Sequence, residues 1–229
     1  MGRLTAGDFP ATVPAPCPAG APRPHDLLAL AGPEALALDG PLPEWARESL
    51  SRAPWVVARR AAPERGRWPV GVRGARREER LAAWVAEASV LRRLSPEDLA
   101  AARGWRAPAR RRWPFTPALE LAEEALARAG LAWGPAGSVG FELATGAAAA
   151  GAASDLDLVV RAPAPLPREL ARELWGRLAA SPVRIDAQVE TPAGAFALAE
   201  YAADTAAVAL RTAAGPRRVA DPWREGSAR

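Results

Sequence analysis

The sequence predicts an α+β protein in which a small N-terminal α/β domain is followed by a second domain built on a mixed sheet. A chain of 229 residues is long enough for one large domain or two small ones. Segments of strand-like composition alternate with segments of helical apolar spacing. Residues 103–117 are dense in Arg, Pro and Trp, which is typical of a connection. We therefore expect a Pro-rich arm at residues 1–24, a first domain at 25–112 and a second domain at 113–229.

The composition excludes several classes of protein. Hydrophobic residues make up 49% of the chain, enough for a sizeable core, so global disorder is excluded. All 30 of the Lys and Arg residues are Arg, a bias that a GC-rich genome explains most simply. The arginines are interspersed with acids rather than gathered into a basic stripe, which argues against nucleic acid as a partner. One cysteine, Cys17, excludes an internal disulfide framework.

The chain carries no signal for secretion or membrane insertion. Its first residues lack a basic start followed by an apolar run, and no uncharged apolar stretch is long enough to span a bilayer. A single thiol fits a reducing compartment. We therefore expect a cytoplasmic protein without a membrane partner.

The first domain is expected to hold a small antiparallel sheet together with helices. Trp55–Arg60 and Trp68–Arg73 are rich in residues that suit strands, and together they predict a hairpin. Residues 76–93 carry apolar side chains at helical spacing and predict a helix. Shorter helical segments are expected at residues 25–38, with a connection, and at residues 44–50.

Helix start and stop signals delimit the second half of the chain. Ser95 at a cap position, Pro96 in the first turn and two following acids predict a helix start. Thr116 is expected to cap another helix, which ends at Gly130. The later predicted elements are a strand-like segment at Gly137–Leu143, a flexible connection at residues 146–153, a strand at Ser154–Val160, a helix at Leu166–Ala180, a strand at Val183–Thr191 and a hairpin at residues 208–220.

Two carboxylates share one face of the strand at Ser154–Val160. Because side chains alternate between the faces of a strand, Asp155 and Asp157 point to one side and the leucines beside them to the other. Two like charges about 7 Å apart are unfavourable unless solvent or a cation offsets their repulsion. Carboxylates are ligands for hard divalent cations such as Mg²⁺. Taken alone, the pair is explained more simply as a solvated acidic face, and a metal site becomes the favoured interpretation only together with the residues that follow.

The next strand places a third acid in a similar position. Val183–Thr191 alternates apolar and polar residues, and Asp186 lies in its middle, where Asp is disfavoured without a reason. Gln188 and Glu190 share its face, where they either orient ligands or serve the sheet. If the two strands pair, three carboxylates converge on one surface, and such a site can hold two Mg²⁺ ions.

A Gly-Ser pair precedes these acids. Glycine at a turn lets the backbone approach a triphosphate closely, so Gly137 and Ser138 are candidates for binding phosphate oxygens. The pair alone is weak. Its order ahead of Asp155, Asp157 and Asp186 makes a phosphoryl-transfer site the favoured interpretation.

This order of motifs resembles the DNA polymerase β-like nucleotidyltransferase superfamily. Within it, the chain is similar to the phosphoribosyl-dephospho-CoA transferases of malonate decarboxylase systems. The similar segments are Gly137–Gly146, Ser154–Leu158 and Asp186–Pro192 in the second half, and His25–Leu28, Pro54–Arg60 and Val70–Gly74 in the first. The resemblance covers most of the chain after the arm. It implies a catalytic domain of the polymerase β-like nucleotidyltransferase fold, preceded by a domain that binds substrate or partner.

The resemblance also implies a reaction. A serine of the apo acyl carrier protein of malonate decarboxylase would attack the α-phosphate of 2′-(5″-triphosphoribosyl)-3′-dephospho-CoA, and pyrophosphate would leave. Such chemistry needs positioning and charge neutralisation. Mg²⁺ or Mn²⁺ would bind Asp155, Asp157 and Asp186, of which Asp186 is also the candidate base. Gly137 and Ser138 would hold the triphosphate.

Three arginines of the first half are candidates for substrate binding. Arg59, Arg60 and Arg73 lie within the family-like segments, and a guanidinium matches phosphate oxygens. Taken singly, each is explained as a solvated surface charge. His25, the single histidine, is assigned a cap or a buried hydrogen bond, because the chemistry does not require it.

Two other functions remain as alternatives. One is another Mg²⁺-dependent nucleotidyltransferase that acts on a small molecule or RNA. The other is a non-catalytic module that binds a carrier protein, and the retention of three acids argues against it.

Overall fold

The computed structural model describes residues 20–76 and 78–224, which form two compact units. Of the described residues, the first unit comprises 20–59, 63–76, 78–94 and 144–148, and the second comprises 60–62, 95–143 and 149–224. The main division thus falls at residues 94–95, whereas the sequence places it at 112–113. Cys17 and most of the expected arm lie outside the described residues. Helices and two separate sheets confirm the α+β class.

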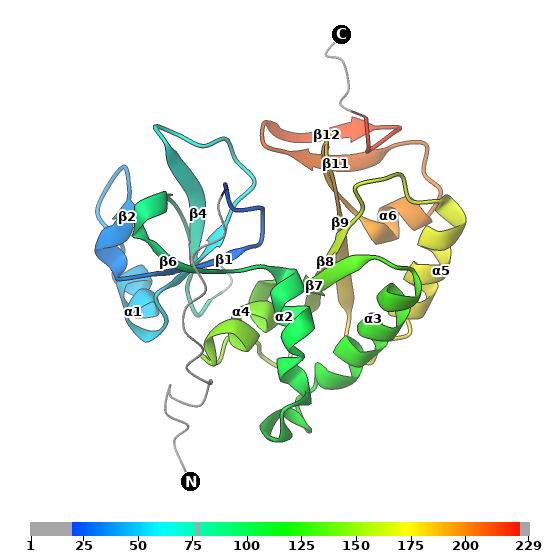
Figure 1. Cartoon of the computed structure of the whole chain (residues 1–229), viewed down its shortest axis with the longest axis horizontal. Coiled ribbons are helices and arrows are strands. Elements are labelled where there is room, and N and C mark those ends of the chain that lie inside the picture. The colour runs from blue at the N-terminus through cyan, green and yellow to red at the C-terminus, as the bar shows by residue number, and fades with distance from the viewer. Residues whose placement is uncertain (1–19, 77, 225–229) are drawn as a thin grey trace. The chain divides into compact units, whose positions relative to one another are not determined.

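The first unit is an antiparallel sheet of six strands in the order β2-β5-β4-β3-β1-β6 (Figure 1). Its elements are β1 Leu27–Leu30, η1 Pro33–Ala35, β2 Leu36–Ala37, α1 Glu44–Arg52, β3 Trp55–Ala58, β4 Arg67–Arg73, β5 Arg80–Ala86, η2 Glu87–Ser89 and β6 Val90–Leu94. The predicted hairpin is confirmed, because β3 pairs antiparallel with β4. The predicted helix at residues 44–50 is confirmed as α1.

Two predicted helices of the first half are wrong. Residues 76–93 contain β5 and most of β6, and the expected helix near residue 27 is the strand β1. In β5, Ala83 and Val85 are fully buried and alternate with partly exposed neighbours, which is the period of a strand. The strand pairs with β4 along its whole length. This non-local ladder outweighs the local helical spacing.

The second unit is a mixed sheet of six strands in the order β12-β11-β10-β9-β8-β7. Only β8 and β9 pair in parallel; the other neighbours are antiparallel. The elements are α2 Pro96–Ala102, η3 Gly104–Arg106, η4 Pro108–Arg110, α3 Thr116–Arg128, β7 Ala132–Pro135, α4 Gly137–Thr145, β8 Leu156–Arg161, α5 Arg168–Leu178, β9 Ile185–Thr191, β10 Gly194–Ala197, α6 Leu198–Ala202, β11 Val208–Thr212 and β12 Gly215–Val219. The mixed sheet and the late hairpin are as predicted.

Helix α2 begins with the predicted cap and packs on β7. The Ser95 hydroxyl accepts a hydrogen bond from the Asp98 N–H, and the Asp98 carboxylate accepts one from the Ser95 N–H. A Cβ atom at Gly134 would lie 1.8 Å from the carbonyl oxygen of Pro96. Glycine in β7 therefore permits the close approach of the helix start to the strand.

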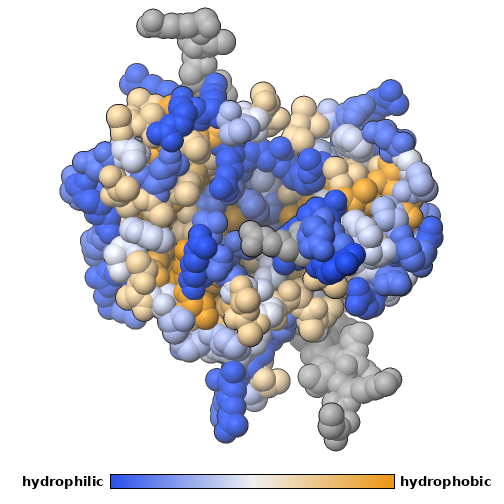
Figure 2. All heavy atoms as spheres, turned by 180° about the vertical axis from the view of Figure 1, so that it is seen from behind, coloured by the Kyte–Doolittle hydropathy of each residue, from blue (hydrophilic) through white to orange (hydrophobic). Residues whose placement is uncertain are grey.

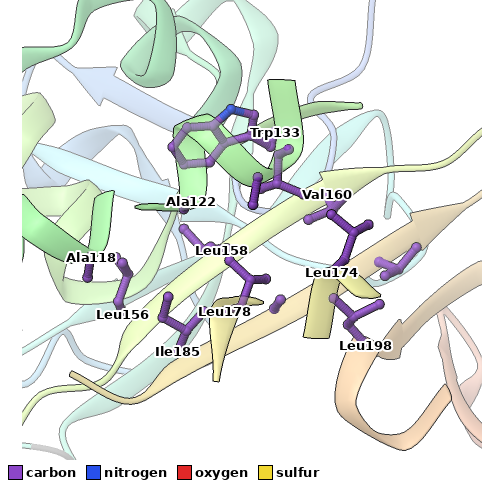
Figure 3. Close-up of a cluster of buried hydrophobic side chains, with 14 of the residues drawn as sticks. Ala118, Ala122, Trp133, Leu156, Leu158, Val160, Leu174, Leu178, Ile185 and Leu198 are labelled. Carbon is purple, nitrogen blue, oxygen red and sulfur yellow. The ribbon is translucent and has the colours of Figure 1, made fainter. Parts of the chain in front are cut away.

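One face of the second sheet carries the hydrophobic core. Leu156, Leu158 and Ile185 are at most 4% exposed. Figure 3 shows these side chains packed with Leu174 and Leu178 of α5. Because strand side chains alternate, the polar residues between them are directed to the opposite face.

The segment Gly137–Leu143, predicted as strand-like, is the helix α4. Gly137 has φ +57, which turns the chain sharply after β7. The buried residues Val139 and Leu143 then lie four apart, on one side of the helix. The local sequence lacks a helix-specific signal, and packing in the core decides its structure. Thr116 also differs from prediction: Phe115 is the cap of α3, while the Thr116 hydroxyl donates to the Arg110 carbonyl at 2.9 Å.

The surface of the described chain is largely polar. Leu91, at 58% exposure, is the large hydrophobic side chain that stands exposed there. Figure 2 shows one face, on which hydrophilic side chains surround scattered apolar ones. Within residues 20–76 and 78–224, no helix combines the length and apolar character needed to cross a membrane.

Candidate functional site

Two of the predicted acids lie on neighbouring strands at the same level. In the parallel pair β8–β9, Asp157 is the direct partner of Asp186. Both side chains are directed away from the core, because Leu156 and Leu158 on one strand and Ile185 and its alternate neighbours on the other are buried. Strands in a sheet lie about 4.8 Å apart, so the two carboxylates share one small patch of surface.

Asp155 lies just before β8, and its carboxylate faces Arg184. The backbone N–H of Leu156 donates to the carbonyl oxygen of Arg184 at 2.8 Å, which aligns the two chains at this point. Oδ2 of Asp155 lies 3.5 Å from Nη1 of Arg184. Both side chains are exposed to solvent, at 43% and 77%. Such an exposed pair contributes little to stability, so it leaves Asp155 able to take other partners.

The Gly137 turn lies directly against Asp157. The N–H of Ala136 donates to the Asp157 carbonyl at 2.9 Å. A Cβ atom at Gly137 would lie only 1.8 Å from Oδ2 of Asp157. The glycine therefore serves both the left-handed turn and the close approach of backbone to carboxylate. Ser138, in the first turn of α4, is buried at 3% exposure.

This patch brings negative charge to the start of a helix. The first N–H groups of a helix carry partial positive charge and bind anions, including phosphates. Helix α4 begins at Gly137, beside Asp157. In the described part of the chain, no bond or ion pair engages the Asp186 carboxylate. The patch therefore combines the partly positive start of a helix with two adjacent carboxylates.

The donor set suits a hard divalent cation. As the side chains stand, the described residues hold no group of three or more His, Cys, Asp or Glu that could bind a metal ion. Mg²⁺ is commonly bound by one or two carboxylates, with waters and substrate phosphates completing its shell. Asp157 and Asp186 meet that requirement, and Asp155 is the nearest acid in sequence that could join them.

A second charged group lies further along the same face. Glu190 is 7% exposed, and both of its carboxylate oxygens accept from Nη2 of Arg60. Arg161, its partner in the β8–β9 register, lies 3.8 Å from it and also binds Glu97 at 2.8 Å. Gln188 donates to Glu190 at 2.9 Å. These contacts support the structural interpretation of Glu190 over a ligand-orienting one.

Replacing Glu190 by Gln is expected to lower the free energy of unfolding by about 3 kcal/mol, because it leaves nearly buried guanidinium groups without their anionic partner. For a chain of this length the melting temperature should fall by roughly 6–12 °C. Glu173→Gln is the control: Glu173 is 59% exposed and pairs with Arg177 one helical turn away, so its loss should cost less than about 0.5 kcal/mol. Equal shifts for the two variants in thermal denaturation would contradict this account.

The three candidate arginines have different positions. Arg60 belongs to the second unit and is bound to Glu190. Arg59 belongs to the first unit, where its N–H donates to the Pro69 carbonyl and its side chain lies 3.4 Å from the Cβ position of Gly71. Arg73 ends β4, and its carbonyl accepts from the hydroxyl of Ser49. The substrate-binding role of all three stays a prediction.

Sequence reasoning missed two features near the site, the contact between Arg161 and Glu190 and the role of Glu142. Arg161 lies four residues after Asp157, and Glu190 lies four after Asp186, so each shares the face of its aspartate. Opposite charges at matching positions on two strands expected to pair could have indicated the Arg161–Glu190 contact. The role of Glu142, which binds the loop before Asp155, had no comparable signal.

Comparison with known proteins matches both halves of the chain to one family. The model of the phosphoribosyl-dephospho-CoA transferase MdcG N-terminal domain matches residues 23–96, and that of the C-terminal domain matches residues 98–222. The boundary between them lies close to the division of the structure at residues 94–95.

Curated relatives agree with the family models over nearly their whole length. A phosphoribosyl-dephospho-CoA transferase of Azotobacter vinelandii is 46% identical over 211 residues, which are 90% of this chain and 97% of the relative. Those of Pseudomonas putida and Klebsiella pneumoniae are 45% and 43% identical over 203 residues, 89% and 88% of this chain and 96% of each relative. No solved structure matches the chain. The chain therefore belongs to the phosphoribosyl-dephospho-CoA transferase family and is a transferase.

Proposed function

We propose that this chain transfers the phosphoribosyl-dephospho-CoA group from 2′-(5″-triphosphoribosyl)-3′-dephospho-CoA to a serine of the apo acyl carrier protein of malonate decarboxylase. The serine oxygen forms a bond to the α-phosphorus, the bond from that phosphorus to the β-phosphate oxygen breaks, and pyrophosphate leaves. The single observation that carries the phosphoryl-transfer step is the pairing of Asp157 with Asp186 beside the Gly137 turn, whereas the transferred group and the acceptor are proposed from membership of the family.

The geometry supports phosphoryl transfer because it offers groups that would bind the phosphate oxygens and, close to them, carboxylates that would hold a metal ion. In this proposal the turn at Gly137 and the first N–H groups of α4 bind phosphate oxygens, as the start of a helix commonly does. The same turn touches Asp157, so bound phosphate and the carboxylates would lie close together. Phosphoryl transfer depends chiefly on such positioning and on neutralising the charge that develops on the phosphate oxygens.

The residues that would hold Mg²⁺ or Mn²⁺ are Asp157 and Asp186, with Asp155 as a third. When bound, the metal supplies neutralisation of triphosphate charge and polarisation of the attacking hydroxyl. The proton of the carrier serine passes to the Asp186 carboxylate. This carboxylate suits the role, because in the described chain it has no bond that would have to break first.

The test is a transfer assay with the purified protein, Mg²⁺, the triphosphoribosyl nucleotide and the apo carrier protein. We expect the carrier to gain the mass of one phosphoribosyl-dephospho-CoA group, with one pyrophosphate released for each group transferred. A carrier whose acceptor serine is replaced by alanine should gain no mass, and EDTA should stop the reaction.

The alternatives predict different outcomes of the same assay. A binding module would hold the carrier tightly and release no pyrophosphate. A nucleotidyltransferase for another acceptor would leave the carrier unmodified but release pyrophosphate when a small molecule or RNA is supplied. Either result would overturn the proposed acceptor.

A further inference from the structure

We propose that Glu142 is a positioning residue for the transfer reaction: it anchors the loop that delivers Asp155 to the acidic patch. This inference rests on the proposed function. It concerns the segment between the end of α4 and the start of β8, which is built almost entirely of Gly and Ala. Such side chains cannot hold a loop, so its order has to come from elsewhere.

The Glu142 carboxylate binds two successive backbone groups of that loop. Its Oε2 accepts hydrogen bonds from the N–H of Ala149 and the N–H of Ala150, both at 3.0 Å. Hydrogen bonds to an ionised acceptor are about twice as strong as neutral ones. Two consecutive amides bound to one oxygen fix the direction of the chain as well as its position.

Glu142 is itself held from the opposite side. Nη1 of Arg110 lies 3.5 Å from its Oε1, and Nη2 of Arg110 donates to the Glu142 carbonyl at 3.2 Å. The Arg110 guanidinium in turn lies over the Trp113 ring, 4.5 Å from its centroid. Glu142 and Arg110 are only 14% and 20% exposed, so the anchor is largely shielded from solvent.

A short hydrogen-bonded turn holds the chain between Ala150 and Asp155. The N–H of Ser154 donates to the Gly151 carbonyl at 3.0 Å, and the Ser154 hydroxyl accepts from the Gly151 N–H at 3.0 Å. Asp155 follows immediately. Glu142 and this turn therefore fix the chain on the approach to Asp155, while β8 fixes it afterwards.

Glu142 matters for turnover because Asp155 is exposed and its own side chain does not hold it in place. Among the described residues, the side chain of Asp155 has one contact, the solvent-exposed pair with Arg184, which is too weak to set the position of the backbone. Catalytic groups misplaced by about 1 Å can lose roughly 10²-fold in rate. Loss of the anchor should therefore reduce turnover through Asp155, although Glu142 itself touches no reacting atom.

The chain offers a matched control for Glu142. Glu123 is 15% exposed and binds two arginines, Arg103 and Arg106, neither of which belongs to the loop. Glu142→Ala and Glu123→Ala thus each remove a largely buried carboxylate with arginine partners. Only the first removes acceptors for Ala149 and Ala150.

Three measurements test the proposal on the full-length protein. Glu142→Ala should lower kcat about 100-fold, leave KM for the carrier protein unchanged and shift the Mg²⁺ requirement to higher concentration. Glu142→Gln, which keeps an acceptor oxygen at the same reach, should restore part of the turnover. Hydrogen exchange should show lost protection at the Ala149 and Ala150 amides in Glu142→Ala. In Glu123→Ala both turnover and this protection should persist.

Equal turnover in folded Glu142→Ala and Glu123→Ala would overturn the positioning role, as would unchanged exchange at the two amides. If Glu142→Ala does not fold, Glu142→Gln decides, because faster amide exchange with lower kcat is expected there too, and wild-type values for both would overturn the proposal. Failure of the wild-type protein to transfer the group would instead overturn the proposed function, which separates the two inferences.

Discussion

Replacing Asp186 by Asn is expected to abolish transfer while slightly stabilising the fold. Asn keeps the shape of the side chain but cannot accept the serine proton and is a poor ligand for Mg²⁺. The loss in kcat/KM should be on the order of 10³-fold or more, as for other residues that act directly in a reaction. The fold should gain because Asp186 lies directly opposite Asp157, and like charges in that arrangement destabilise a sheet by about 0.2–1 kcal/mol.

The gain in stability separates a catalytic acid from a structural one. Without divalent metal and at low salt, the melting temperature of Asp186→Asn should rise by about 1–3 °C above that of the wild type. Asp39→Asn is a suitable control, because Asp39 is an exposed acid of the first unit and its replacement should change neither turnover nor stability. Normal turnover in Asp186→Asn, or a clear fall in its melting temperature, would remove Asp186 from the site.

The position of Asp186 was predictable because it follows from strand periodicity alone. Alternation places Asp157 and Asp186 on the polar faces of their strands, and burial of the leucines and isoleucine between them fixes those faces. One condition remained open, namely whether the two strands pair. The structure shows that the two strands pair in parallel and that Asp157 and Asp186 are direct partners in the register.

Elements whose structure depends on distant contacts were not predictable in the same way. The apolar spacing of residues 76–93 fits a helix, yet β5 is a strand because it pairs with β4 along its whole length. The ion pair between Arg60 and Glu190 joins residues 130 positions apart, and no local pattern could indicate it. Glu142 likewise acts through hydrogen bonds from backbone amides, and no pattern of side chains in the sequence indicates such bonds.

Replacing Gly137 by Ala is expected to cost both stability and activity, because two physical effects add at this position. The backbone has φ +57, where a residue with a Cβ atom is less stable by roughly 1–2 kcal/mol. The new Cβ would also lie 1.8 Å from Oδ2 and 2.7 Å from Cγ of Asp157, so the carboxylate has to leave its place. We expect turnover to fall about 10²-fold, because Asp157 is displaced from its partner Asp186.

Gly130 allows the two effects to be separated. Its φ is +65, but a Cβ atom there would meet nothing within 4 Å, so Gly130→Ala carries the conformational cost alone. The difference in unfolding free energy between Gly137→Ala and Gly130→Ala then measures the clash with Asp157. Gly130→Ala should retain normal turnover.

A double variant tests whether the clash involves Asp157 itself. When Asp157 is replaced by Ala, its carboxylate no longer meets the new Cβ, so Gly137→Ala should cost less stability in that background than in the wild type. Contacting residues are expected to be non-additive in this way, whereas independent sites add within about 0.5 kcal/mol. Additive costs, together with equal losses for Gly137→Ala and Gly130→Ala, would mean that the turn does not press on the Asp157 carboxylate. Gly137 would then be required for its backbone conformation alone, and its close contact with Asp157 would not contribute to the site.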